Sequence, residues 1–403
     1  MTSINAKTDK TNEACETMNI LLSIHHGLDH SAGAPGVTVK LADALSGRGH
    51  AVRVISFDDL KRLPGKLRGV VFPWMVFAHV LKHPEYDVLD LSSGDGWVVN
   101  VARRVFGWRS KMLTATRSHG LEQLAHEMLL QGCRDGIFTK SWKYPLYNGS
   151  YRLWECRKSF QMADLLLLLN ETERQYASKR FGVDAQKIAT VGNGIDECFA
   201  GVARRLIAND EEALPDLPVN VAFAGRATFW KGFPFLVEAM TAVLARYPQM
   251  KLGLFGTGGT EQSVLAEFPE SLRAQVVVMP RYENHALPEL LADYQIFAFP
   301  SLGEPFGIAP LEAMACGLVP IVAEAPGPGE YIRNGKNGVV VPPRDSAALA
   351  RAIVEMVEDR ERRLELRRAA LRSALWYSWG DLAARLELVY CQHRQKSHSF
   401  EAI

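Results

Sequence analysis

Short apolar runs alternate with longer amphipathic windows along most of the chain. Between residues 37 and 48, Val37, Leu41, Ala44 and Leu45 recur at the spacing of one helix face. The short runs, such as 165–169, are apolar at every position, as in the strands of a parallel sheet that is covered on both faces. The alternation of such strands with helices predicts an α/β fold.

The predicted strands form two series, one in each half of the chain. The first series is 19–23, 52–56, 70–72, 88–92, 111–117, 164–169 and 187–191, and the second is 219–224, 251–255, 276–279, 296–300, 319–323 and 338–341. Helices are expected over 37–48, 234–246, 287–294 and 347–357. Two such series predict two doubly wound, Rossmann-like domains with parallel sheets. Ligands of these sheets bind outside the carboxyl ends of the strands, so the cleft between the domains is the expected site.

The domain boundaries follow from local composition. Residues 1–17 are polar and lack the apolar core of a signal peptide, so we expect a disordered leader there. Gly, Asn, Pro and acidic residues gather between 192 and 218, which is linker composition. We therefore expect an N-terminal domain over 18–195, a linker over 196–218 and a C-terminal domain over 219–375.

Length, charge and cysteine spacing exclude several classes of protein. A net charge of +1 over 403 residues does not favour a nucleic-acid-binding protein. No apolar run reaches the ~18 residues that a membrane-spanning helix needs. The six cysteines show no C-x-x-C spacing, so neither a zinc ribbon nor a redox pair is indicated. Their scatter is typical of a reducing compartment, which favours a cytoplasmic protein.

Basic residues are concentrated in one stretch. Residues 101–150 hold eight basic and three acidic side chains; the basic ones are Arg103, Arg104, Arg109, Lys111, Arg117, Arg134, Lys140 and Lys143. One interpretation is an ordinary solvated surface. The other is contact with an anionic partner, such as a lipid headgroup or a phosphorylated acceptor.

The segment 299–320 carries the most informative chemistry. A strand is expected to end at Pro300, followed by a loop with Glu304 and Gly307 and by a short helix over 310–316. The free backbone N–H groups of such a helix start form an anion site, which Gly307 lets a ligand approach. Glu312 is expected in the first turn of this helix. It would then accept hydrogen bonds from ligand hydroxyl groups beside the anion.

Two further loops follow predicted strands. Arg226 and Lys231 flank the loop after strand 219–224, and a pair of cations there suits a diphosphate. The loop over 25–36 carries His25, His26 and His30, but their spacing matches no familiar metal-ligand pattern. Neither this loop nor Gly256–Gly259 completes a G-x-G-x-x-G motif, so support for nicotinamide binding is weak.

The segment from Glu304 to Glu312, E-P-F-G-I-A-P-L-E, resembles the signature of the retaining family 4 glycosyltransferases, which have the GT-B fold. Other segments are similar to that family as well: Gly225-Arg226 with Lys231-Gly232, Asn193 to Asp196, Gly327 to Glu330, Asn337 to Val341, and Trp379. The resemblance spans about residues 19–390. It departs from the family near Gly33, where a G-G pair is usual and the chain reads A-G-A-P-G.

The resemblance implies a nucleotide-diphosphosugar donor held mainly by the C-terminal domain, and a last helix, over 376–395, that crosses back to the N-terminal domain. It implies catalytic roles for His119, Arg226, Lys231 and Glu304. It also implies donor contacts from Gly33, Arg226, Lys231, Arg281, Tyr282, Glu304, Phe306, Gly307, Ile308 and Glu312. No metal or other cofactor is expected, since two cations and a helix N-terminus would stabilise the leaving diphosphate.

Several questions stay open from sequence. The resemblance implies an acceptor bound by the N-terminal domain, which would be a saccharide, a glycolipid or a small molecule. The basic stretch adds the hypothesis of peripheral contact at the inner face of a membrane. Alternatives to a glycosyltransferase are a catalytically silent GT-B scaffold subunit, a GT-B sugar phosphorylase or epimerase, and, more remotely, a nicotinamide oxidoreductase.

Overall fold

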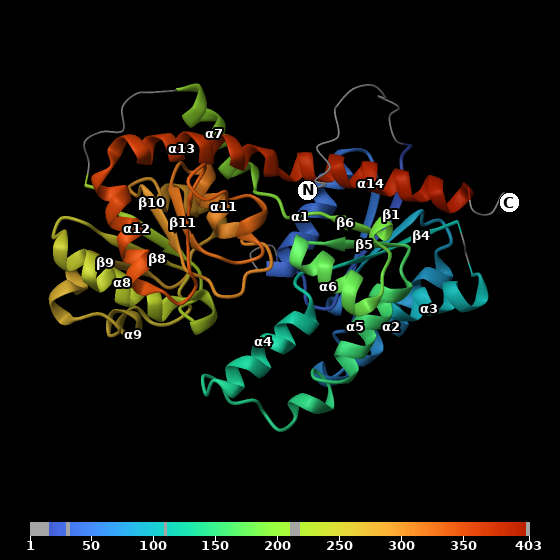
Figure 1. The fold of residues 1–403 in the computed structure, drawn as a ribbon. Coiled ribbons are helices and arrows are strands. Elements are labelled where there is room, and N and C mark those ends of the chain that lie inside the picture. The colour runs from blue at the N-terminus through green and yellow to red at the C-terminus, as the bar shows by residue number, and fades with distance from the viewer. Residues whose placement is uncertain (1–15, 30–32, 109–110, 210–217, 400–403) are drawn as a thin grey trace.

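The computed structural model describes residues 16–29, 33–108, 111–209 and 218–399. These residues form two α/β domains side by side, each built on a six-stranded sheet whose paired strands are all parallel (Figure 1). The predicted pair of doubly wound domains is therefore confirmed.

The N-terminal sheet has the strand order β2-β1-β3-β4-β5-β6. Its strands are β1 (Asn19–Ile24), β2 (Ala51–Ser56), β3 (Val88–Ser92), β4 (Leu113–Arg117), β5 (Leu165–Leu168) and β6 (Ile188–Thr190). Its helices are α1 (Gly33–Gly47), α2 (Gly65–Lys82), α3 (Trp97–Phe106), α4 (Glu122–Arg134), α5 (Tyr151–Met162) and α6 (Glu171–Phe181). Strands β3, β4 and β5 are buried at every position. β5 is all leucine, as expected for a strand covered on both faces, whereas β3 and β4 also bury polar side chains, among them Asp90 and Arg117.

The C-terminal sheet has the order β12-β11-β10-β7-β8-β9. Its strands are β7 (Val221–Ala224), β8 (Leu252–Phe255), β9 (Val276–Met279), β10 (Ile296–Phe299), β11 (Val319–Ala323) and β12 (Val339–Val341). The helices from the domain joint onward are α7 (Glu197–Ala208), α8 (Phe233–Arg246), α9 (Glu261–Leu265), α10 (Leu287–Leu290), α11 (Ile308–Ala315), α12 (Ser346–Glu358), α13 (Arg360–Ala374) and α14 (Trp379–Ser399).

Helix α14 leaves the C-terminal domain and lies along the N-terminal one (Figure 1). Its residues Trp379, Leu386 and Tyr390 share one hydrophobic core with β1 and α1. The Tyr390 hydroxyl donates a hydrogen bond of 2.6 Å to Asp90, which also pairs with the buried guanidinium of Arg117. The helix therefore joins the two domains by apolar packing and by a buried polar contact.

An arm, residues 122–150, projects from the N-terminal domain toward the C-terminal one and begins with α4 (Figure 1). The ring of Phe138 stacks on Trp230, with ring centroids 5.1 Å apart, and meets Phe229 edge to face at 5.7 Å. Asp135 lies 3.9 Å from Arg344. The arm thus makes a second bridge between the domains.

Four local predictions were wrong. Residues 70–72, predicted as a strand, belong to helix α2. This helix is apolar on both its buried and its exposed side, so its sequence lacks the alternation of apolar and polar residues that is typical of a helix. The predicted linker 196–218 contains α7, whose Phe199, Ala200 and Ala203 are buried in the C-terminal core. The helix expected over 287–294 ends at Leu290. The helix expected over 310–316 begins at Ile308 instead, directly after Gly307 in the left-handed region (φ 84°).

Candidate active site

A cavity of 320 Å³ lies between the two domains. The N-terminal domain and the joint line it with Gly33, Ala34, Gly36, Val37, Lys40, His119, Leu169 and Asn193. The C-terminal domain contributes Lys231, Tyr282, Asn284, Glu304, Pro305, Phe306, Gly307, Ile308, Ala309 and Glu312, and α14 contributes Trp379. The first residues of α1 and of α11 both belong to this lining, so two helix N-termini meet one space.

The loop between β10 and α11 is fixed by its neighbours. The Gly327 N–H donates 2.9 Å to the Glu304 carbonyl, and the Tyr331 hydroxyl donates to the Gly307 carbonyl. Phe306 is buried, and a Cβ on Gly327 would overlap its backbone. The first amides of α11 therefore stay aimed at the cavity, where they suit an anion.

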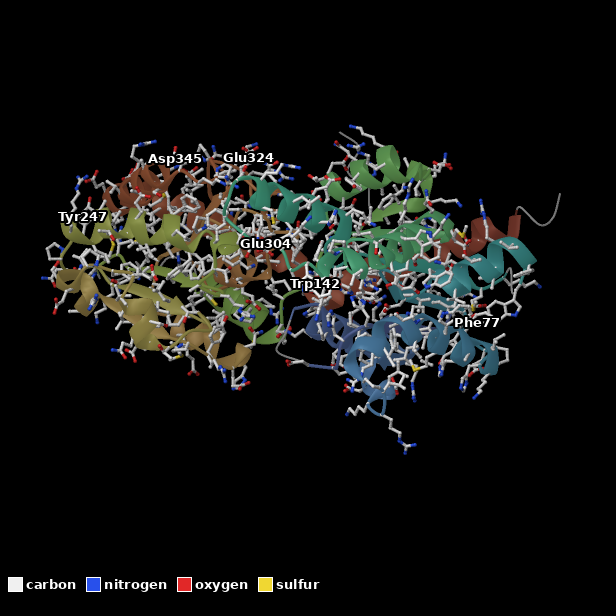
Figure 2. The ribbon with its side chains drawn as sticks, turned by 90° about the horizontal axis from the view of Figure 1, so that it is seen from below. Phe77, Trp142, Tyr247, Glu304, Glu324 and Asp345 are labelled. Atoms are coloured by element: carbon white, nitrogen blue, oxygen red, sulfur yellow. The ribbon has the colours of Figure 1, made fainter. Side chains whose placement is uncertain are left out.

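Glu304 and Lys231 face each other in the cavity wall, and Figure 2 shows Glu304 where the two domains meet. The Lys231 ammonium donates 2.5 Å to Glu304 Oε2 and lies 5.3 Å from the centroid of the Phe299 ring. The turn that carries Lys231 ends at Gly232 (φ 70°), where a Cβ would overlap the carbonyl of Pro300. This close approach brings the β7 loop against the end of β10 and holds the cation beside the α11 N-terminus.

A polar network connects Glu312 to the joint between the domains. Asn284 Nδ2 donates 3.3 Å to Glu312 and 3.0 Å to Asp196. Asp196 also accepts 3.0 Å from the Trp379 indole and pairs with Lys40 of α1 at 2.6 Å. Glu312 is only 6% exposed, and burial raises the pKa of its carboxyl to about 7, although Lys40 and Asn284 act in the opposite direction. It lies in the second turn of α11, not in the first turn as predicted.

His119 is held as a neutral imidazole. Burial, and then the charge of Arg117, lower its pKa to about 3. Its Nε2 lies 2.9 Å from the Ser92 hydroxyl, and that hydroxyl already donates its proton to the Ser23 carbonyl. Nε2 must therefore carry the hydrogen and donate to Ser92, so Nδ1 is left with a lone pair that can accept a hydrogen bond.

The structure does not bring every predicted residue to the cavity. Arg226 and Arg281 are exposed, and neither belongs to the described lining. Tyr282 does line it, and burial followed by the charge of Glu312 raises the pKa of its hydroxyl, so the phenol stays protonated. Of the described residues, no group of His, Cys, Asp and Glu side chains has the arrangement of a metal site; His30 lies outside the described residues.

A charged cluster near His119 was missed by the sequence reasoning. Arg152 donates 3.0 Å to Glu122, 2.6 Å to Glu155 and 2.9 Å to a nitrogen of His25, whose other nitrogen lies 3.2 Å from Asp95. Asp95 and Glu155 are fully buried, and burial raises the pKa of Glu155 to about 7. Asp95 follows β3 and Glu122 begins α4, so the rule that ligands bind beyond strand ends could have identified these two.

Comparison with known proteins supports the family suggested by the motifs. Residues 32–198 match the model described as Glycosyltransferase Family 4, and residues 207–373 match the model described as Glycosyl transferases group 1. The chain belongs to the family 4, group 1 glycosyltransferases.

Two curated relatives show how far the likeness of this chain extends. The D-inositol 3-phosphate glycosyltransferase of Corynebacterium urealyticum is 30% identical over 61% of this chain and 62% of that protein. The alpha-maltose-1-phosphate synthase of Mycolicibacterium smegmatis is 28% identical over 62% of this chain and 69% of that protein. The segments matched in the first four curated relatives span between 51% and 62% of those proteins.

Solved structures of glycosyltransferases share the whole two-domain fold of this chain. The sucrose-phosphate synthase of Thermosynechococcus elongatus superposes with a TM-score of 0.70 at 20% identity, covering 93% of this chain and 98% of that one. Anabaena HepE in complex with UDP gives a TM-score of 0.66 at 19% identity, with 93% and 100% covered. These likenesses establish the two-domain architecture.

Proposed function

We propose that this chain transfers a glycosyl group from a nucleoside diphosphate sugar to a hydroxyl of an acceptor, with retention of the anomeric configuration. One observation carries the proposal: two helix N-termini, from α1 and α11, and the Lys231 ammonium line a single interdomain cavity. Positive charge fixed in advance on both sides of a cleft suits the phosphates of a leaving diphosphate.

The other lining residues fit the rest of such a donor. Glu312 would accept hydrogen bonds from the ribose hydroxyls. Tyr282 lines the same cavity and would contact the base. Glu304 would accept from hydroxyls of the transferred sugar, and His119 Nδ1 would accept from another. The family relatives and the UDP and UDP-glucose complexes of HepE are consistent with this donor class.

The reaction requires no covalent enzyme intermediate. The bond between the sugar C1 and the diphosphate oxygen breaks, and a bond from C1 to the acceptor oxygen forms on the same face. The acceptor hydroxyl proton passes to the departing phosphate oxygen. Lys231 and the α11 amides stabilise the negative charge that develops on that phosphate. We expect turnover without added metal, because these groups supply the positive charge.

We propose that the acceptor lies against His25, Glu122 and His119 in the N-terminal domain. Two further carboxylates, those of Asp95 and Glu155, are buried behind this wall, where Asp95 lies beside His25 and Glu155, like Glu122, accepts from the guanidinium of Arg152. Carboxylates accept hydrogen bonds from hydroxyls and repel phosphate. We therefore favour a neutral polyhydroxylated acceptor, a saccharide or a glycolipid headgroup, over a phosphorylated one.

The test is a thermal-shift panel of UDP, GDP and ADP and their sugars, with and without EDTA. A ligand at 100 times its dissociation constant should stabilise the protein by about 2.7 kcal/mol. One nucleotide should do so in wild type and not in Lys231→Met. If none stabilises the protein, a silent scaffold becomes the better account. Product formed only with inorganic phosphate, or without any acceptor, would instead indicate a phosphorylase or an epimerase.

A further inference from the structure

Helix α2 presents an apolar face to solvent. Between residues 67 and 81 the exposed positions are Leu67, Val70, Trp74, Ala78 and Leu81, and all five are apolar. Their spacing of three or four residues places them on one side of the helix. Phe72, Val76 and Val80 fill the opposite, buried side. A helix on the surface of a globular domain ordinarily turns polar side chains outward, so this face has a different use.

The apolar face continues onto the arm and onto α5. A Cβ on Gly69 would overlap the hydroxyl of Tyr147, so the arm touches α2. Next to Tyr147, Leu146 is 69% exposed, and Trp142 at the tip of the arm is 77% exposed. On the other side, Trp74 meets Trp97 edge to face at 5.7 Å, and Trp97 meets the exposed Trp154 at 5.1 Å.

We call this surface the α2–arm face; its exposed apolar members are Leu67, Val70, Trp74, Ala78, Leu81, Trp142, Leu146 and Trp154. Figure 2 is viewed from the side of the molecule on which α2 and the arm lie, with Phe77 of α2 and Trp142 of the arm labelled. The surface thus spans two segments that are well separated in sequence.

The segments that border this face are rich in basic side chains, although Lys61 pairs with Asp58 at 3.4 Å and His83 lies 2.9 Å from Glu85. Residues 61–83 contain five basic side chains and no acidic one: Lys61, Arg62, Lys66, Arg68 and Lys82. Residues 136–151 contain Lys140 and Lys143 and again no acidic side chain. Positive charge around exposed Trp and Leu is complementary to an anionic lipid surface. A second copy of this chain would bring the same positive charges against it and would be repelled.

The basic stretch 101–150 does not form one surface by itself. Arg117 is buried in its ion pair with Asp90, and Arg103 pairs with Asp164. Arg109 lies outside the described residues. Lys140 and Lys143 remain exposed, and they belong to the arm, beside Trp142. Arg104, Lys111 and Arg134 are exposed as well, on α3, before β4 and at the end of α4. Two of the exposed basic residues of the stretch, Lys140 and Lys143, therefore lie at the α2–arm face.

We propose that the α2–arm face binds the surface of a bilayer containing anionic lipid, with α2 lying parallel to the membrane plane and its apolar side chains among the acyl chains. No helix of the described residues is long and apolar enough to cross a membrane, so this contact is peripheral. In this orientation the tryptophans and the cationic side chains would lie at the level of the lipid headgroups. Both kinds of side chain are favoured at that depth of a bilayer. The contact is separate from the donor cavity and does not depend on the proposed transfer reaction.

Vesicle flotation of the full chain tests the proposal. Wild type should float with phosphatidylcholine vesicles that contain about 30% phosphatidylglycerol, much less with pure phosphatidylcholine, and less again in about 0.5 M salt. The triple variant Leu67→Ser/Trp74→Ser/Leu81→Ser should bind the anionic vesicles at least roughly tenfold more weakly. An unchanged thermal unfolding temperature would show that it is folded.

The matched control is Trp376→Ser, which removes a tryptophan that is 74% exposed outside the α2–arm face. Its vesicle binding should equal that of wild type. The proposal is overturned if wild type does not float with anionic vesicles, or if the triple variant floats as well as wild type does. It is also overturned if wild type is a dimer by light scattering and the triple variant a monomer, because a second copy then covers the face.

Discussion

Replacing Glu312 by glutamine should stabilise the ligand-free protein while it weakens nucleotide binding. The carboxyl is 6% exposed in the wall of the donor cavity, and Asn284 is its hydrogen-bond donor. Glutamine keeps the shape and an acceptor oxygen for Asn284, and it removes the charge that burial opposes. The variant therefore isolates the energetic effect of one ionised group.

The magnitude follows from the pKa of Glu312, which burial raises from 4.5 to about 7. The folded protein holds this proton more tightly than the unfolded chain does. The stability gained in this way is complete below pH 4.5 and is lost as the pH rises through about 7. The difference between the two pKa values corresponds to about 3 kcal/mol, which is an upper limit for the gain from glutamine at pH 8.

The assay is thermal unfolding at several pH values. At pH 8, Glu312→Gln should unfold up to about 5–10 °C above wild type, and below about pH 5 the two should coincide. The exposed Glu324→Gln is the matched control and should show no difference at either pH. A variant that is less stable than wild type at pH 8, or equally stabilised at both pH values, would refute the reasoning.

The same carboxylate gives a pH dependence of binding. Wild type should bind its nucleoside diphosphate more tightly as the pH rises from 6 to 8, because the ionised form accepts hydrogen bonds from both ribose hydroxyls. In Glu312→Gln the affinity should be weaker and nearly independent of pH. Calorimetric titration of wild type and variant at these pH values distinguishes the two outcomes.

Three further substitutions or measurements probe other parts of the site. Lys231→Met should weaken nucleoside diphosphate binding by about 1.5–3 kcal/mol in calorimetry and leave nucleoside binding unchanged, whereas the exposed Lys251→Met should bind both as wild type does. Gly327→Ala should lower the unfolding temperature by the equivalent of about 1–3 kcal/mol and impair nucleotide binding, because its Cβ would overlap Phe306. Gly329→Ala, which meets nothing within 4 Å, should do neither, and equal effects of the two would contradict the packing argument. Nitrogen-15 NMR of His119 should show a neutral ring protonated at Nε2 that does not titrate between about pH 5 and 8; a midpoint near the ordinary value of 6.5 would contradict the assigned burial.

The sequence was most informative where function depends on consecutive residues. The β10–α11 loop was predicted with Glu304 and Gly307 in place, because strand end, turn glycine and helix start are local signals. Only the helix start was misplaced: Pro310 was read as the first helical residue, and it is the third. Proline is tolerated there as well, since the first amides of a helix have no internal partner.

Features built from distant segments could not be predicted. The cluster around Arg152 takes its side chains from the ends of β1 and β3 and from α4 and α5, and no local pattern connects them. The exposure of Arg226 and Arg281 likewise depends on how the C-terminal loops fold, although their sequence positions resemble those of the family. The α2 helix was misread because periodicity reveals a helix only when one side is polar, and both sides of α2 are apolar.

The path of α14 has a consequence for how this chain is made. A ribosome releases β1 and its neighbours early, yet the core they share with Leu386 and Tyr390 is incomplete until the entire C-terminal domain has been synthesised. β6, which completes the N-terminal sheet, ends at Thr190. At about 5–20 residues per second, the nearly two hundred residues from there to Leu386 impose a delay of about 10–40 s. During that interval the surface of β1 and α1 that α14 will cover is open to chaperones and to other nascent chains. We therefore expect the N-terminal domain, although translated first, to complete its core last.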